Sequence, residues 1–425
     1  MSFTRSPFGR TLRGGIFALA VAAACNETSA PILRYPVLDE TGQSDWQSVS
    51  AGADHTCAVK TDGTAFCWGS NQFGQLGVAA TDTVCATGSQ TFSCSSIPVA
   101  VSTNLKFLSI SAGQRHTCAI TTDRDAYCWG GNDQNQLGTF SSGGPALSRV
   151  PGTLPWTQIS AGYTHSCAVR SDGTLLCWGQ NERGELGTDA VAGSSTPIVV
   201  RIANPIAAVS TGQGRTCART TLGVTYCWGA VWFVHQAGID RTRTQATPQR
   251  VPNAPTMAWV DVGSLTTCGI DLGGLAYCWE ANPRGSIGDG TVNGDTMPIR
   301  IALDLRFVQV ASGVAHSCGV TIAGVGYCWG DDSFGQLGVP VSQVGERCDD
   351  AAVPCSTRPV PVLGRQSFVE ISAGLGNHTC GVTTLGNLYC WGLGTFGQRG
   401  DGTIGTAVST PISVFDPRSV VFRAP

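Results

Sequence analysis

Cysteine and histidine are the residue types in this chain whose spacing could do chemistry. The 425 residues include nineteen cysteines, and fourteen of these form seven pairs with ten residues from one cysteine to the next. The pairs are Cys57–Cys67, Cys118–Cys128, Cys167–Cys177, Cys217–Cys227, Cys268–Cys278, Cys318–Cys328 and Cys380–Cys390. Paired thiols can form disulfides or hold a metal ion, and each use requires a different arrangement of the chain.

A histidine precedes the first cysteine of five pairs by two residues; these are His55, His116, His165, His316 and His378. Zinc needs four ligands around one point, commonly with two to four residues between paired cysteines. One histidine and its cysteine pair supply three ligands, which leaves the fourth ligand missing. Successive pairs belong to different parts of the fold and cannot share one ion. We therefore expect no metal and no cofactor, a disulfide within each pair, and histidines that hydrogen-bond the backbone.

The cysteine pairs recur with the period of an internal repeat. The segment HTCAVKTDGTAFCWGSNQFGQLG at 55–77 returns at 116–138 and at 165–187, and four more divergent copies follow. Successive pairs are 61, 49, 50, 51, 50 and 62 residues apart. A unit of about 50 residues is the size of one four-stranded propeller blade. Each unit divides into an aromatic-led strand, a hairpin that contains the cysteine pair, and a proline-led strand.

The hairpin turn provides an independent test of this division. The midpoint of each cysteine pair is the middle of a three-residue loop, whose third residue is glycine in six copies and Arg124 in the seventh. A loop of this length needs a left-handed residue at that position, and glycine adopts this conformation without steric cost. The two cysteines then face each other across neighbouring antiparallel strands, within disulfide distance.

The pattern G-x-x-H-[TS]-C-A-V … Y-C-W-G-x-N-x-x-G-Q-L-G resembles the regulator-of-chromosome-condensation repeat. The resemblance covers roughly residues 44–416 and recurs seven times. It implies an all-β fold, a seven-bladed β-propeller whose four-stranded antiparallel blades each contain one disulfide-linked hairpin. The chain departs from the family in its cysteines and in its fourth copy, which lacks the G-Q-L-G ending.

Residues 1–24 have the pattern of a secretory signal peptide. Arg5, Arg10 and Arg13 precede the apolar run 14–24. Eleven apolar residues are too few for a transmembrane helix, which needs about 20. Nineteen cysteines also suit an oxidising compartment better than a reduced cytosol.

The end of this segment is similar to a bacterial lipoprotein signal, although Ala22 stands where that motif usually has leucine. We expect lipidation of Cys25, with ordinary signal-peptidase cleavage as the alternative. Residues 25–45 then form a polar tether, 46–416 the propeller and 417–425 a C-terminal tail. The expected location is the outer membrane or cell surface of a bacterium, or its periplasm or medium.

Two further cysteine pairs, Cys85–Cys94 and Cys348–Cys355, lie in inserts at the same position of the repeat. The same position means the same face of the ring, and copies one and six flank copy seven, so we expect the two loops to lie near each other. Loops on a rigid scaffold are common binding surfaces, and neutral insertion is the alternative. The candidate binding residues are Thr87, Gln90, Phe92, Asp349, Asp350 and, in the divergent fourth copy, Trp232.

Composition and motifs exclude several function classes. A net charge of −3 supplies no basic surface for nucleic acid. The sequence has no G-x-S-x-G, H-E-x-x-H or P-loop motif. We therefore expect a non-enzymatic monomer that binds a protein or a surface polymer. The alternatives are a secreted inhibitor of another enzyme, exchange-factor-like binding of a small GTPase, and a glycan-active propeller enzyme.

Overall fold

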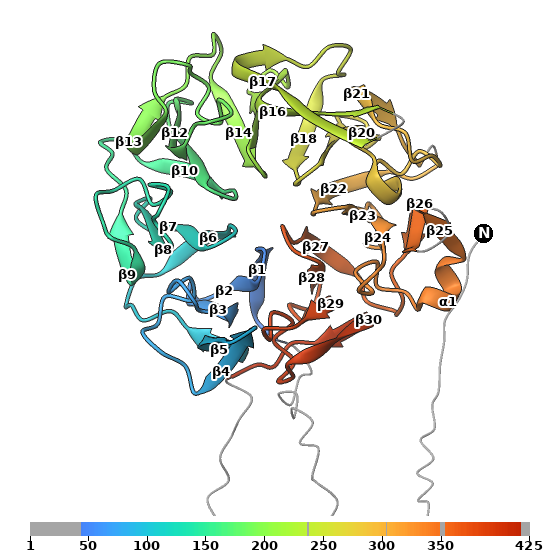
Figure 1. Ribbon diagram of the computed structural model, residues 1–425, viewed down its shortest axis with the longest axis horizontal. Helices are drawn as coiled ribbons and strands as arrows, with labels where there is room; N and C mark the ends of the chain where they lie inside the picture. Colours follow the sequence, from blue (N-terminus) through green and yellow to red (C-terminus); the bar gives the residue numbers. More distant parts are fainter. Residues whose placement is uncertain (1–43, 236–237, 303, 349–352, 418–425) are drawn as a thin grey trace, which may run out of the picture. The chain divides into compact units, whose positions relative to one another are not determined.

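The computed structural model describes residues 44–235, 238–302, 304–348 and 353–417. Within this part of the chain, seven antiparallel sheets surround a common axis (Figure 1). We number these blades one to seven in chain order. The predicted all-β, seven-bladed propeller with four-stranded blades is confirmed, and blades one and six each carry a fifth strand. The predicted signal peptide, Cys25, and most of the predicted tether and tail lie outside the described residues.

The first strand of each blade lines the centre of the ring (Figure 1). The seven first strands are β1 (Trp46–Ala51), β6 (Phe107–Ala112), β10 (Trp156–Ala161), β14 (Ile206–Thr211), β18 (Met257–Val262), β22 (Phe307–Ser312) and β27 (Phe368–Ala373). The seven second strands are β2 (His55–Lys60), β7 (His116–Thr121), β11 (His165–Arg170), β15 (Arg215–Thr220), β19 (Thr266–Asp271), β23 (His316–Thr321) and β28 (His378–Thr383).

The third and fourth strands complete each blade towards its outer edge. The third strands are β3 (Ala65–Ser70), β8 (Ala126–Gly130), β12 (Leu175–Gln180), β16 (Thr225–His235), β20 (Ala276–Glu280), β24 (Gly326–Asp331) and β29 (Leu388–Gly394). The fourth strands are β5 (Gln90–Ala100), β9 (Gly144–Arg149), β13 (Gly193–Val199), β17 (Gly238–Arg250), β21 (Asp295–Arg300), β26 (Val353–Pro361) and β30 (Gly405–Ser413). The additional elements are β4 (Thr83–Thr87), β25 (Glu346–Cys348), the short 3₁₀ helix η1 (Pro283–Gly285) and helix α1 (Val341–Val344).

The second and third strands of each blade form the predicted hairpin. Its two cysteines pair directly across the strands, as Cys57 and Cys67 do in blade one, and all seven such pairs are disulfides with Cα atoms 4.0–4.1 Å apart. Gly63, the third residue of the first loop, has a φ angle of 80°, and the exceptional Arg124 adopts a φ of 65° at the same position. The predicted left-handed residue is therefore present even where the sequence lacks glycine.

Adjacent blades pack against each other through seven apolar clusters, one at each junction. A buried tryptophan from a third strand lies in every cluster; these residues are Trp68, Trp129, Trp178, Trp228, Trp279, Trp329 and Trp391. At the junction of blades one and two, Trp129 packs with Leu76 and Val101. Burial of apolar surface between sheets thus holds the blades together.

The ring closes without a strand shared between its ends. All four strands of blade seven come from residues 368–413. Blade one instead bonds to blade seven directly: Trp46 N donates to the Gly386 carbonyl at 3.1 Å, and the Thr56 hydroxyl lies 2.8 Å from His378 Nε2. The last junction therefore uses the same kinds of contact as the others.

Candidate functional site

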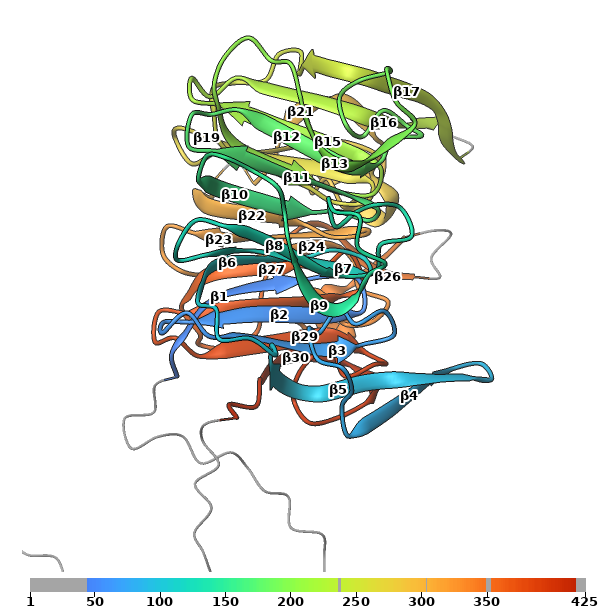
Figure 2. The same cartoon turned by 90° about the vertical axis from the view of Figure 1, so that its left-hand side faces the viewer.

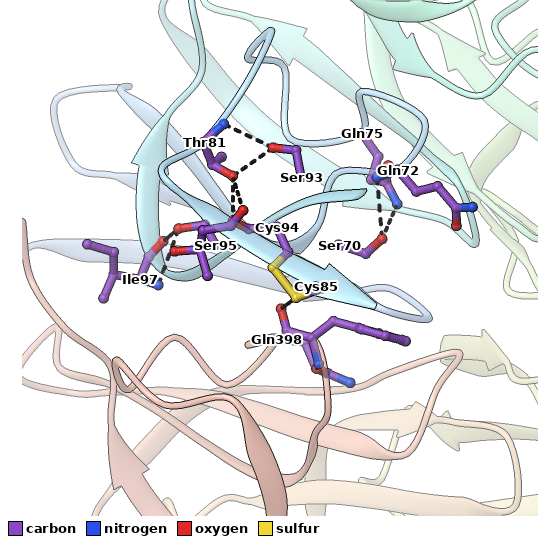
Figure 3. Close-up of a disulfide and its surroundings, with 12 residues drawn as sticks. Ser70, Gln72, Gln75, Thr81, Cys85, Ser93, Cys94, Ser95, Ile97 and Gln398 are labelled. Atoms are coloured by element: carbon purple, nitrogen blue, oxygen red, sulfur yellow. Dashed lines mark hydrogen bonds between the residues drawn. A yellow bond between two sulfur atoms is a disulfide. The ribbon is translucent and has the colours of Figure 1, made fainter. Parts of the chain in front are cut away.

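The insert of blade one forms a stapled hairpin that extends from one face of the ring (Figure 2). Strand β4 pairs with the first half of β5, from Thr87 opposite Gln90 to Thr83 opposite Cys94. The second half of β5 pairs with β3, so one continuous strand belongs to both the hairpin and the blade. The Cys85–Cys94 disulfide, with Cα atoms 5.8 Å apart, links the two strands of the hairpin diagonally (Figure 3).

Hydrogen bonds fix the base of this hairpin. The Thr81 backbone N donates to the Ser93 hydroxyl at 2.9 Å, and the two hydroxyls lie 2.7 Å apart (Figure 3). Ser95 donates its hydroxyl to the Ile97 carbonyl at 2.6 Å. The hairpin is therefore held in one position by its own side chains as well as by its disulfide.

The hairpin also rests on the neighbouring blade seven. The rings of Phe92 and Phe396 lie 5.4 Å apart between centroids, and Cys85 Sγ lies 3.8 Å from the Phe396 carbonyl oxygen. Gly402 N donates to the Ser96 carbonyl at 2.8 Å. Because the hairpin is attached to two blades, its exposed residues are presented on a rigid base.

The insert of blade six forms a second stapled hairpin, from β25 and β26, with a Cys348–Cys355 disulfide. It rests on blade five, where Gly290 N donates to the Thr357 carbonyl at 2.8 Å. The predicted sites Asp349 and Asp350 lie outside the described residues. Each hairpin thus contacts the blade that precedes it in the ring. The hairpin of blade one lies against blade seven and the hairpin of blade six lies against blade five. Blade seven therefore lies between them, and the two loops are not adjacent as expected (Figure 1).

Both inserts lie in the connection between the third and the fourth strand of their blade. In an antiparallel blade, this connection and the one between the first and second strands lie at the same end of the strands, and therefore on the same face of the ring. We call this the hairpin face. The β16–β17 connection of blade four is on the same face (Figure 2). Of the predicted binding residues, Thr87 and Gln90 are exposed, whereas Phe92 is half-buried against Phe396. Trp232 lies within β16, and its side chain lies outside the part of the structure that is described.

Two exposed apolar side chains on the hairpin face escaped the sequence analysis. Val84 in β4 is 67% exposed, and Phe140 in the β8–β9 connection of blade two is 87% exposed. A phenylalanine among serine and glycine, in the segment GTFSSGG, was the available signal for Phe140. Large exposed aromatic side chains are common anchors in protein interfaces.

The loops between second and third strands lie on the opposite face, and they divide into two kinds. The loops of blades one to three carry an aspartate, as at Asp62 and Asp172. Those of blades four to seven carry exposed aliphatic residues instead: Leu222, Leu272, Ile322 and Leu385. The sequence contains this pattern, although only the positions of the loops on one face show what the residues share.

The repeated histidines hydrogen-bond the next blade around the ring and not the backbone, so the expected backbone bond is wrong. His116 Nε2 lies 2.8 Å from the Ser166 hydroxyl, which itself donates to the Gln136 carbonyl at 2.9 Å. The hydroxyl must therefore accept from the imidazole, which places the proton on Nε2. Equivalent bonds join His55 to Thr117, His165 to Thr216, His316 to Thr379 and His378 to Thr56.

Burial keeps these imidazoles neutral. Desolvation lowers the pKa of His55, His116, His165 and His378 to about 3, and that of His316 to about 4. Within the described residues no group of three or more histidines, cysteines or acids could hold a metal ion. The histidines therefore connect blades.

At the junction of blades four and five, an ion pair replaces the histidine bond. Arg215 takes the histidine position and pairs with Glu280, which also accepts a hydrogen bond from Thr267 at 2.9 Å. Glu280 occupies the position of a glycine in the other blades and has a φ of 87°. Burial raises the pKa of Glu280 to about 7, although Arg215 opposes this shift. The charge of each unusual residue is thus paired with the opposite charge of the other.

The carboxylates of the Asp-Gly segments stabilise their own turns. Asp62 accepts a hydrogen bond from Thr64 N at 2.9 Å, and Asp289 accepts one from Thr291 N at 2.9 Å. In the central channel, a cavity of about 310 Å³, Asp261 accepts from Ser312 N at 2.7 Å. These acids accept hydrogen bonds from the fold's own backbone.

No helix in the described part of the chain has the length and apolar character to cross a membrane.

Comparison with known proteins agrees with the repeat pattern. The family model of the RCC1-like domain matches residues 18–305, and that of the Regulator of chromosome condensation (RCC1) repeat matches residues 368–398. The chain is 29% identical over 360 residues to the Ultraviolet-B receptor UVR8 of Arabidopsis thaliana, which covers 84% of this chain and 67% of that protein.

Two other similarities are to part of a much longer protein and to a solved structure. A bifunctional serine/threonine-protein kinase/NEDD4-like E3 ubiquitin-protein ligase of Dictyostelium discoideum is 28% identical over 83% of this chain, which corresponds to 18% of that protein. Prp20p from Saccharomyces cerevisiae, characterised for its binding to Gsp1p and histones, aligns with a TM-score of 0.72 at 20% identity, covering 88% of each chain. The latter similarity shows a shared fold.

Proposed function

We propose that this chain, which belongs to the RCC1-like domain family, is a non-enzymatic scaffold that binds a protein outside the cytoplasm through its hairpin face. The observation that supports this proposal most is the stapled hairpin of blade one. Its disulfide and its contacts with blade seven hold Val84, Thr87 and Gln90 in place before any partner arrives. Such preorganisation lowers the cost of ordering a loop on binding.

The cysteines support a location outside the cytoplasm. Nine disulfides in the described chain indicate an oxidising environment, because reduced thiols prevail in the cytosol. Export by residues 1–24 and a lipid on Cys25 would account for that environment, and both remain predictions. The membrane would then be contacted only through the lipid anchor.

A protein partner is favoured over a surface polymer by the side chains available on this face. Phe140 is an exposed aromatic group and Val84 an exposed aliphatic one, and aromatic side chains are enriched in interfaces between proteins. The binding of Prp20p to Gsp1p and histones is a precedent within the same fold. The hairpin residues of blade six would extend the surface on the far side of blade seven.

Affinity purification from the extracytoplasmic fraction tests the proposal. The Val84→Asp variant places a charge on the hairpin, and Leu272→Asp places the same charge on the opposite face. We expect the wild type and Leu272→Asp to retain the same protein, and Val84→Asp to retain at least tenfold less. Retention that depends on Leu272 and not on Val84 would assign binding to the opposite face, and retention of a polysaccharide alone would contradict a protein partner.

A further inference from the structure

Strand β4 leaves the outer edge of blade one open. It is the last strand of a five-stranded sheet and pairs with β5 alone (Figure 1). The hairpin turns through two residues, the first of which is Gly88 with a φ of 59°, and the pair that closes the turn is Thr87 and Gln90. Because a two-residue turn is closed by a hydrogen-bonded pair, Thr83, Cys85 and Thr87 direct their backbone N–H and C=O groups towards β5.

The backbone groups of Val84 and Ala86 point the other way. Residues in an antiparallel ladder alternate in direction, so the N–H and C=O groups of these two residues face outward from the sheet. Within the described part of the chain, no residue forms a hydrogen bond with any of these four groups. Both residues are exposed, and Val84 is exposed to 67%. The edge therefore presents two donors and two acceptors with the spacing of a β-ladder.

The outer edges of the other blades are protected against the addition of a strand. Proline cannot donate to a ladder, and charged side chains disfavour pairing with another edge. In blade six, the fifth strand β25 carries the exposed Glu346 and Arg347. In blades two, three, four, five and seven, the fourth strand forms the outer edge and contains a proline; these residues are Pro145, Pro197, Pro248, Pro298 and Pro411. Strand β4, with the sequence TVCAT, has neither a proline nor a charge.

The open edge is also fixed in position. The Cys85–Cys94 disulfide links β4 to β5, and Phe92 of β5 packs against Phe396 of blade seven. A strand that is fixed before binding loses little conformational freedom when another strand pairs with it. Exposed sheet edges are the surfaces to which extended peptides bind by strand addition.

We propose that an extended segment of the partner protein adds to β4 as a further strand of the blade-one sheet. This inference rests on the proposed function, because the edge belongs to the stapled hairpin. In an antiparallel addition, Val84 exchanges two backbone hydrogen bonds with one residue of the segment, and Ala86 exchanges two with the residue two positions away. The residue opposite Val84 is β-branched or aromatic, since such side chains pack well in cross-strand pairs.

A segment of another protein fits this edge better than a second copy of the chain does. The five residues of β4 extend over about 17 Å. Two copies joined by this edge alone would bury less than the roughly 1,200 Å² of a stable protein interface. A polysaccharide does not supply donors and acceptors with the period of a strand. A flexible segment, in contrast, pairs with β4 and continues over the exposed hairpin face.

The peptide acetyl-KTVTVTK-amide, which is rich in β-branched residues, is a suitable probe. It is titrated to millimolar concentration into the whole oxidised protein, isotope-labelled in valine and alanine, and the amide resonances are followed by NMR. The Ala86 resonance is assigned by its loss in Ala86→Pro, and the Val84 resonance by its loss in Val84→Thr. We expect both amides to exchange rapidly with solvent in the free protein, and to shift and exchange about tenfold or more slowly when the peptide is bound.

Two substitutions at Ala86 separate backbone pairing from a general effect on the fold. Ala86→Pro removes one outward N–H, and an edge strand tolerates proline where its N–H faces solvent. We expect this variant to keep its disulfides and its unfolding temperature, and to bind the peptide about tenfold or more weakly. Ala86→Ser keeps the N–H and should bind the peptide as the wild type does.

The amide measurements decide whether the edge is open and whether it accepts a strand. The central strand β2 pairs on both sides, so the amide of Val59 serves as the protected reference. The proposal is overturned if the Val84 and Ala86 amides of the free protein exchange as slowly as that of Val59. It is also overturned if millimolar peptide leaves both resonances unmoved.

Affinity purification with the same variants distinguishes this inference from the proposed function. Loss of the partner in Val84→Asp but not in Ala86→Pro would keep the hairpin as the binding surface and overturn strand addition. Peptide binding at the edge without any retained protein would support strand addition and contradict the proposed function. A dimer of the wild type that Ala86→Pro abolishes, measured by sedimentation, would assign the edge to a second copy and overturn the partner segment.

Discussion

Lys60 Nζ lies 2.7 Å from Asp416 Oδ1, and this contact joins blade one to the segment that follows the last strand of blade seven. Asp45, just before β1, accepts from the same ammonium group at 2.8 Å. The Lys60 side chain is fully buried, with its Nζ 4.6 Å from the centre of the Trp46 ring. One cation thus connects both ends of the described propeller at the junction where the ring closes.

Replacement of this cation should loosen the closure. We expect Lys60→Met to lower the free energy of unfolding by about 1–3 kcal/mol, because two partly exposed carboxylates lose a charged hydrogen-bond donor. The matched control is Lys106→Met, which removes the exposed pair with Asp62 and should cost less than about 1 kcal/mol. Urea unfolding of both variants provides the comparison, and equal losses would show that the closure has no special role.

Stability should fall in acid because of the interblade histidines. Their folded pKa values of about 3 to 4 lie below the usual 6.5, so between these limits only the unfolded chain takes up protons. The contribution of these groups to the free energy of unfolding is therefore greatest above pH 6.5. Between pH 6.5 and the folded pKa, it falls by about 1.4 kcal/mol per pH unit for each histidine.

Three buried acids partly offset this trend. Burial raises the pKa of Glu280, Asp332 and Glu370 to about 7, so the folded chain holds extra protons between about pH 4.5 and 7. The loss of stability should consequently steepen below pH 4.5, where the acids are protonated in both states. Urea unfolding from pH 7 to 3.5 measures the slope, and His116→Gln should reduce it by one proton. A stability that does not change between pH 6.5 and 4 would contradict the neutral, buried histidines.

The Arg215–Glu280 pair should behave as a unit in a double-mutant cycle. Either Arg215→Met or Glu280→Gln leaves a buried polar partner uncompensated, and we expect each to cost about 3 kcal/mol or more. The double variant should cost less than the sum of the two by at least about 1 kcal/mol. Thermal and urea unfolding measure these values, and strict additivity would mean that the two residues do not interact in solution.

The thiol count tests the disulfide pattern as a whole. The chain has nineteen cysteines, and eighteen of them are in the nine disulfides of the structure, which leaves one, Cys25. Titration of the denatured, unreduced protein should therefore find at most one reactive thiol. Two or more reactive thiols would show that part of the pattern is not formed.

Much of this fold could be predicted from the sequence because each unit is local. The ten-residue spacing of Cys57 and Cys67 sets the hairpin register, and a left-handed loop residue is required at Arg124 as it is at Gly63. Features that join blades were less predictable. The acceptor of His116 lies 50 residues away, and a backbone carbonyl would have satisfied the same ring nitrogen.

The candidate site was predictable only in part. Cysteines 85 and 94 located the hairpin, and the exposed Thr87 and Gln90 were identified, but Phe92 packs against a blade more than 300 residues further along the chain. This result depends on which blades are neighbours in the closed ring.

Photo-crosslinking in intact cells tests the proposed binding face most directly. A photoreactive residue placed at the exposed Gln90 should form a covalent adduct with one partner protein, and the same residue at the exposed Asp172 on the opposite face should form none. An adduct at Asp172 without one at Gln90 would contradict the account.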